Sequence, residues 1–206
     1  MDYSVFLQYL NDHIDTSGKH GRQIIQFPNK RHFLNCMNEL YKLRGKYTAL
    51  RNIRIASLLQ AFVCPLSKAP LLSSTNWSLK IEKDARIKVL TASSDKNPMP
   101  ELPWGVKRIG APEVWSRSTG HGIRIGVIDT GVDYNHPDLK NSVARGVNVI
   151  NSTTLPHDDN GHGTHIAGTI AAAGGMQGMI GVAPRAIIYP VKAFSYDGSA
   201  YVSDII

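Results

Sequence analysis

The 206-residue sequence has little of several features that would settle its class at once. It holds only two cysteines, Cys36 and Cys64, which give neither a disulfide framework nor a zinc pattern, so we expect buried free thiols. No apolar run is long enough to cross a membrane, and residues 1–12 lack the basic start and apolar run of a signal peptide. As written, the chain is expected in the cytoplasm, or secreted if translation starts upstream.

Acidic residues are also few, and the formal net charge of +7 suggests a nucleic-acid partner at first sight. The distribution of charge argues against it. Residues 1–100 carry 15 Lys and Arg against 7 Asp and Glu, whereas residues 101–206 carry 8 against 9. The basic side chains are spread along the first half without a dense patch and interleaved aromatics, so we expect no nucleic-acid partner and no membrane partner.

The first hundred residues are predicted to hold a small α+β domain. Residues 1–22 are typical of a short amphipathic helix or a loose arm. A strand at 23–27 is followed by a helix that starts at Pro28 and Asn29, ends at Gly45 and has one apolar face. The strand, helix, strand, strand, helix, strand order that continues over residues 23–91 is typical of a ferredoxin-like domain. The helix face comprises Phe33, Met37, Leu40 and Tyr41; the later elements are a β-rich passage at 47–55 and 58–63, a helix at 69–74, and one or two strands in 77–89.

A linker is predicted at residues 92–101, because this stretch is polar, contains two prolines and has no periodicity. Residues 102–206 then form an α/β region. The apolar run at 123–128 is typical of a buried parallel strand and ends in Asp129. Functional groups gather at the carboxyl ends of strands in open α/β sheets, so Asp129 is a candidate active-site acid.

His162 is the second candidate, because it stands where an acidic turn, Asp159-Asn160-Gly161, gives way to a helix of small residues that runs to about Ala173. The positive end of a helix dipole disfavours the imidazolium form and keeps the ring available as a base. A lone histidine at such a place is more often a capping or surface residue. Together, Asp129 and His162 supply two of the three parts of a nucleophilic triad.

Four motifs in this half resemble the subtilisin-like serine proteases: V-I-D-T-G-V-D at 127–133, H-P-D-L at 136–139, H-G-T-H-I-A-G-T at 162–169 and G-V-A-P at 181–184. The resemblance covers residues 102–206 and implies the front half of a parallel-sheet peptidase domain, with Asp129 as triad acid and His162 as general base. It implies a protein or peptide substrate and no cofactor for the chemistry. By the same resemblance Phe194 lines the second substrate pocket, with ordinary packing as the alternative, and the edge segment Gly198, Ser199 and Ala200 pairs with an extended peptide.

The resemblance also implies that residues 23–91 are a propeptide, which contacts the protease part intramolecularly and is removed by cleavage between about 91 and 101. Two departures accompany it. The family's structural calcium would use Asp138, but the loop 174–179 offers no carboxylate or asparagine, which makes calcium a weak expectation. No serine stands in the family's G-T-S setting, so we expect these residues to be a truncated zymogen form that is inactive alone, with a second half that is poorly stable by itself.

Three other interpretations were weighed. A D-T-G string also occurs in aspartic proteases, but only one copy is present here. His162 and His165 lie at i and i+3 and could bind a metal, but no third ligand accompanies them, and His165 is expected to pack beside Asp129 instead. The third is a non-catalytic remnant, or an inhibitor or folding aid of another protease that acts through the first half.

Overall fold

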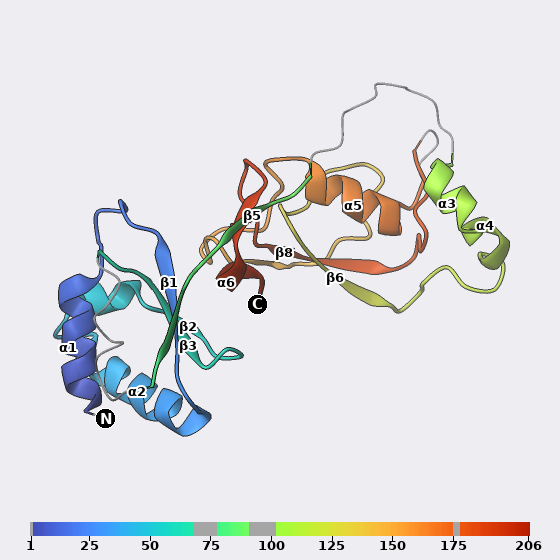
Figure 1. Ribbon diagram of the computed structural model, residues 1–206. Coiled ribbons are helices and arrows are strands. Elements are labelled where there is room, and N and C mark those ends of the chain that lie inside the picture. The colour runs from blue at the N-terminus through green and yellow to red at the C-terminus, as the bar shows by residue number, and fades with distance from the viewer. Residues whose placement is uncertain (1, 68–77, 91–101, 175–177) are drawn as a thin grey trace. The chain divides into compact units, whose positions relative to one another are not determined.

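The computed structural model describes residues 2–67, 78–90, 102–174 and 178–206 (Figure 1). These residues form two compact units, one made of residues 1–85 with Ile206 and one of residues 86–205. The expected helix at 69–74 and the linker at 92–101 lie outside the described residues. Among the residues described, no helix combines the length and the apolar character needed to cross a bilayer.

The N-terminal unit is a four-stranded antiparallel sheet with helices packed beside it. Its sheet order is β2-β3-β1-β4, and α1 packs against α2. The sequence predicted either a helix or a loose arm at the N-terminus, and residues 3–13 form the helix. Its buried side chains Phe6, Leu7 and Leu10 pack in the core. The elements are α1 (Tyr3–His13), β1 (Arg22–Gln26), α2 (Lys30–Leu43), a 3-10 helix η1 (Thr48–Asn52), β2 (Arg54–Ala56), β3 (Ala61–Pro65) and β4 (Lys80–Lys83).

An aromatic cluster fills the centre of this unit. The Phe27 ring contacts Phe62 edge-on, with 5.0 Å between the ring centroids, and also meets Phe6 and Phe33 at 6.1 and 5.9 Å. Such offset and edge-on pairs add about 0.5–1.5 kcal/mol to the burial of the rings themselves. Cys36 and Cys64 lie in the same core as free thiols, as the sequence predicted.

Two predictions for this unit were wrong. A β-rich passage was expected at 47–55, but residues 48–52 form η1. Leu50 and the flanking Tyr47 and Ile53 recur every third residue, which suits the three residues per turn of a 3-10 helix. Tyr41 was expected on the buried face of α2 but is 57% exposed. The buried stripe instead includes Cys36, three residues after Phe33, and Tyr41 lies one position past its edge.

The C-terminal unit contains a three-stranded parallel sheet in the order β6-β8-β7 and a separate antiparallel pair, β5-β9. Helix α5 packs against β6 and β8. This mixed α/β arrangement with a parallel sheet has the layout that the sequence predicted for 102–206. The elements are β5 (Arg86–Lys88), α3 (Trp104–Arg108), α4 (Ala111–Val114), β6 (Arg124–Asp129), β7 (Val147–Asn148), α5 (His162–Ala171), β8 (Ile187–Lys192), β9 (Ser199–Tyr201) and α6 (Val202–Ile205).

Strand β6 is parallel to β8 over its whole length, but only one of its faces is buried. Val127 packs with Ala167 and Ala171 of α5, whereas Ile128 is 48% exposed and Ile123 is also exposed. The apolar run was expected to be a buried parallel strand, in a second half that is poorly stable by itself. In these residues, α5 covers one face, and the side chains that alternate to the other face remain open to solvent.

Candidate active site

Asp129 and His162 meet where β6 ends and α5 begins. The Nδ1 atom of His162 lies 2.8 and 2.9 Å from the two carboxylate oxygens of Asp129, although 33 residues separate them in sequence. Asp129 is only 7% exposed, and the backbone N–H of Thr130 also donates to its carboxylate at 2.7 Å. Because a carboxylate can only accept, Nδ1 carries the proton, which leaves the Nε2 lone pair as the basic position of the ring.

The start of α5 is built without a side-chain cap of its own. The N-cap residue is Gly161, whose positive φ of 101° favours glycine. The first helical N–H groups are satisfied from elsewhere: His162 donates to Asn160 Oδ1 at 3.2 Å, Gly163 to Thr130 Oγ1 at 2.9 Å, and Thr164 to Asp158 Oδ2 at 2.8 Å. Three side chains therefore replace the missing cap and fix the direction in which the helix leaves the loop.

The approach of α5 to the end of β6 is close enough to require glycine at position 163. A Cβ atom built on Gly163 would collide with the Gly131 carbonyl oxygen, and it would lie 3.2 Å from the Cβ atom of Asp129. The glycine therefore allows the helix start and the strand end to come within reach of the Asp129–His162 contact.

Asp158 accepts hydrogen bonds from several groups at once. The hydroxyl of Thr130 donates to it at 2.7 Å and that of Thr164 at 2.6 Å, besides the backbone N–H groups of Asn160, Gly161 and Thr164. Partial burial raises the pKa of the Asp158 carboxyl, but the hydrogen bonds from Thr164, Gly161 and Thr130 outweigh it and lower the pKa to about 2. The group is therefore an anion at any pH near neutrality.

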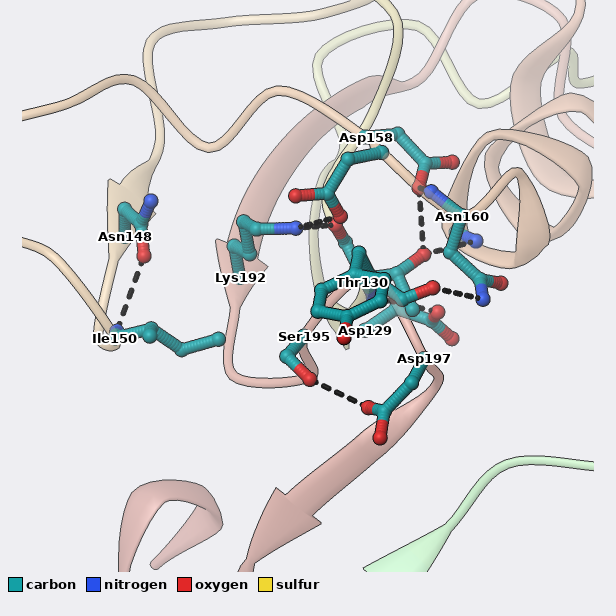
Figure 2. Close-up of polar contacts among 12 residues, drawn as sticks. Asp129, Thr130, Asn148, Ile150, Asp158, Asn160, Lys192, Ser195 and Asp197 are labelled. Atoms are coloured by element: carbon teal, nitrogen blue, oxygen red, sulfur yellow. Dashed lines mark hydrogen bonds and ion pairs between the residues drawn. The ribbon is translucent and has the colours of Figure 1, made fainter. Parts of the chain in front are cut away.

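Lys192, at the end of β8, is a buried cation next to the pair. It is 5% exposed, its strand position is opposite Asp129, and its Nζ atom donates to the Thr130 carbonyl oxygen at 2.5 Å. The same Nζ atom lies 2.6 Å from Asp159 Oδ1. Figure 2 shows the Lys192 side chain directed toward the cluster around Thr130 and Asp129.

The predicted edge segment 198–200 lies in and beside β9, which pairs antiparallel with β5. Ala200 is opposite Ile87 and Ser199 is opposite Lys88, and the Val89 N–H donates to the Gly198 carbonyl oxygen at 2.8 Å. Arg86 also donates to the Ser199 hydroxyl. The segment expected to bind an extended peptide thus has an extended stretch of this chain beside it.

Phe194 is 7% exposed and belongs to a small apolar cluster with Ala193 and Ala200, against which Val89 packs. Asp138 is engaged with the loop that follows α5: the Met179 N–H donates to its carboxylate at 3.2 Å. Among the described residues no group of three His, Cys, Asp or Glu side chains is arranged to hold a metal.

His165 was expected to pack beside Asp129, but it is exposed. It lines a cavity of about 420 Å³ together with His136, His157 and Asp158. The reason is helical geometry: three residues after His162, the side chain is about 300° around α5 and lies on a different part of the helix surface.

Sequence reasoning missed Thr130, Asp158 and Lys192. One signal was available, since a lysine that directly ends an apolar strand, as Lys192 does, must find partners when it is buried. A second was an aspartate three residues before a glycine N-cap. Neither signal names its partner, because the contacts span 28 to 62 residues of sequence.

An imidazole oriented by a buried carboxylate at the carboxyl ends of parallel strands is the arrangement of the general base in hydrolases that use an Asp-His-Ser triad. Comparison with known proteins identifies which family of such hydrolases this part of the chain is similar to. Residues 120–206 match the model of the Subtilase family. This part of the chain is therefore a partial peptidase domain of the subtilisin-like serine proteases.

Curated relatives agree with that assignment. The chain is 39% identical over 127 residues to the "Thermostable alkaline protease" of Halalkalibacterium halodurans, a match that covers 61% of this chain and 34% of the relative. It is 43% identical over 110 residues to the "Intracellular serine protease" of Paenibacillus polymyxa (52% and 34%) and 44% identical over 105 residues to "Subtilisin Savinase" of Lederbergia lenta (50% and 38%). The chain thus spans about a third of the length of these relatives.

Proposed function

We propose that the chain belongs to a serine endopeptidase in which Asp129 orients His162 and His162 acts as general base on a serine hydroxyl. The observation that carries the proposal is the contact of His162 Nδ1 with both carboxylate oxygens of Asp129. It leaves Nε2 free to take a proton from the attacking hydroxyl and to return it to the leaving amine. The carboxylate stabilises the imidazolium that forms between these two steps.

The proposal requires a serine and an oxyanion donor from sequence outside these 206 residues, since no serine here stands in a G-T-S setting. Loss of one oxyanion donor alone lowers turnover by roughly a hundredfold to a thousandfold. A polypeptide of these 206 residues is therefore expected to be inactive, and its joining to the remaining part of a relative is expected to give activity.

The N-terminal unit acts in this proposal as a propeptide. Its sheet order, β2-β3-β1-β4, with every neighbouring pair antiparallel, supports the ferredoxin-like fold expected for residues 23–91. β5 follows β4 directly along the chain and occupies the edge of β9 in the manner of an extended peptide substrate. The chain between β5 and α3 would then be the site of cleavage, within residues 91–101.

A chimera of residues 1–206 with the remaining part of Subtilisin Savinase tests these roles. We expect cleavage within residues 91–101 and hydrolysis of a chromogenic peptide, both abolished by His162→Ala. A folded chimera that hydrolyses no peptide would contradict the endopeptidase proposal. A chimera that is active but unprocessed would contradict the propeptide role alone.

The pairing of β5 with β9 also favours a second function, inhibition of another protease by the N-terminal part. A fragment of residues 1–101, shown to be folded by circular dichroism, would be titrated against Subtilisin Savinase. Inhibition at micromolar concentrations would support this function, and its absence would exclude it. The Ile87→Asp variant is the matched control, because Ile87 pairs with Ala200 in the β5-β9 ladder and a charge there opposes docking.

A further inference from the structure

The residues that directly follow Asp129 and His162 in sequence are hydrogen-bonded to each other. Gly163 N–H donates to Thr130 Oγ1 at 2.9 Å, so the strand end and the helix start are joined one residue beyond the catalytic pair. Thr130 is completely buried. Thr130 therefore links the end of β6, which carries Asp129, to the start of α5, which carries His162.

Thr130 is held in turn by two ionic side chains. Asp158 accepts from its hydroxyl at 2.7 Å, and Lys192 Nζ donates to its carbonyl oxygen at 2.5 Å. Both bridges lead to the same loop. Asp158 belongs to that loop, and Lys192 Nζ lies 2.6 Å from Oδ1 of Asp159, the next residue. We propose that Asp158 and Lys192 are positioning residues, which set the Asp129–His162 contact by clamping Thr130 against the loop that leads into α5.

The chemistry of the two bridges makes them stiff. The Lys192 ammonium is buried, and a buried charge that loses its partners is costly, so the bridge to Thr130 and Asp159 resists opening. The Asp158 carboxylate accepts from Thr130, the residue directly after β6, and from Thr164 on α5, which ties the end of the strand and the start of the helix to one anion. Charge-assisted hydrogen bonds of this kind are about twice as strong as neutral ones.

This inference rests on the proposed function, because Asp158 and Lys192 can be positioning residues only if Asp129 and His162 act in catalysis. A displacement of about 1 Å in a catalytic group can cost on the order of a hundredfold in rate. The test below needs no turnover, so its failure and the failure of the peptidase proposal can be told apart.

The proton on His162 Nδ1 reports the contact directly. In the 206-residue chain it should give a low-field proton resonance, identified by its loss in His162→Ala, and its exchange with water measures how often the contact opens. Asp158→Asn and Lys192→Met are each expected to speed this exchange about tenfold or more. The Asn151→Ala variant is the control, since Asn151 Oδ1 accepts from the N–H and the hydroxyl of Thr153, within the loop after β7 of the same unit.

Two substitutions at Thr130 keep the test valid if Asp158→Asn or Lys192→Met fails to fold. Thr130→Val keeps the shape but lacks the hydroxyl that joins Asp158 to Gly163, and should also speed exchange about tenfold. Thr130→Ser keeps the hydroxyl and should stay within about twofold of the original chain. Unchanged exchange in folded Asp158→Asn, Lys192→Met and Thr130→Val would overturn the proposal. So would equal acceleration in Asn151→Ala, since it would show a general loss of stability.

Discussion

The two units of the molecule are stabilised in different ways. In the described part of the N-terminal unit, the core cluster has fourteen buried side chains, of which four are phenylalanines: Phe6, Phe27, Phe33 and Phe62. The main cluster among the described residues of the C-terminal unit has seven buried side chains, of which three are alanines: Ala167, Ala171 and Ala186. The first unit is therefore held mainly by large apolar contacts, and the second combines small apolar contacts with a polar network around Asp129.

The difference follows from what each unit has to hold in place. Large rings fill a core and keep backbones apart, whereas alanine and glycine allow α5 to come close to β6 and bring His162 onto Asp129. That closeness leaves little apolar area to bury. In addition, Ile128 and Val147 are exposed on the sheet, as is Ile123 directly before β6, although parallel sheets are normally covered on both faces. We therefore expect the C-terminal unit to unfold at a lower urea concentration than the N-terminal unit.

The largest effect is expected at the Asp129–His162 pair and should concern rate alone. In an active chimera, Asp129→Asn places an amide against His162 Nδ1 and favours the wrong imidazole tautomer, so kcat should fall on the order of ten-thousandfold. Peptide hydrolysis measures it. Glu113→Gln, which removes an exposed carboxylate from α4, is the control and should leave kcat unchanged. A loss of less than about tenfold would argue against the role of Asp129.

The next effect is expected in the N-terminal unit and should concern stability alone. Phe62→Ala removes a fully buried ring from contact with Phe27 and Phe33, at a cost of about 3–5 kcal/mol in the free energy of unfolding. The unfolding of the N-terminal unit can be measured separately through Cys36 and Cys64, because both thiols are buried in that unit and the chain has no other cysteine.

Iodoacetamide labelling at increasing urea concentrations therefore follows the N-terminal unit only. Burial raises the pKa of the Cys64 thiol to about 12 and that of Cys36 further, so neither thiol reacts while the unit is folded. Tyr41→Ala, an exposed position on α2, should shift the midpoint little. Equal shifts in the two variants would show that the aromatic cluster is not the main source of stability.

Sequence patterns predicted the elements of the site better than its supporting contacts. Asp129 follows a nearly continuous apolar run at 123–128 and His162 opens a helix of small residues, and both patterns are local. The Lys192 bridge to Thr130 spans 62 residues of sequence, and no local pattern indicates which strand ends will lie side by side. The prediction failed at η1 for a different reason. Over a short stretch, apolar residues three positions apart are easily taken for the alternation, every second residue, of a strand.

A smaller loss of stability is expected where the C-terminal unit depends on close approach. Gly163→Ala would push α5 away from Gly131 and Asp129, at a cost of about 1–3 kcal/mol. Hydrogen exchange of the α5 amides, followed by mass spectrometry, should show the loss. Gly126→Ala is the control, since a Cβ there meets nothing within 4 Å. Equal protection of α5 in both variants would show that the helix tolerates a larger separation from β6.

The smallest effect is expected on acidification, through Asp158. A carboxyl with a pKa of about 2 in the folded protein and near 4 in the unfolded chain contributes stability above pH 4, and this contribution is lost as the pH falls toward 2. Asp158→Asn should therefore reduce α5 protection against hydrogen exchange at pH 6, and the difference from the original chain should shrink between pH 4 and pH 2. The hydrogen bonds that lower the pKa of Asp15 and Asp197 are present in both chains, so the difference isolates Asp158. A difference that stays constant down to pH 2 would show that the Asp158 charge does not stabilise the start of α5.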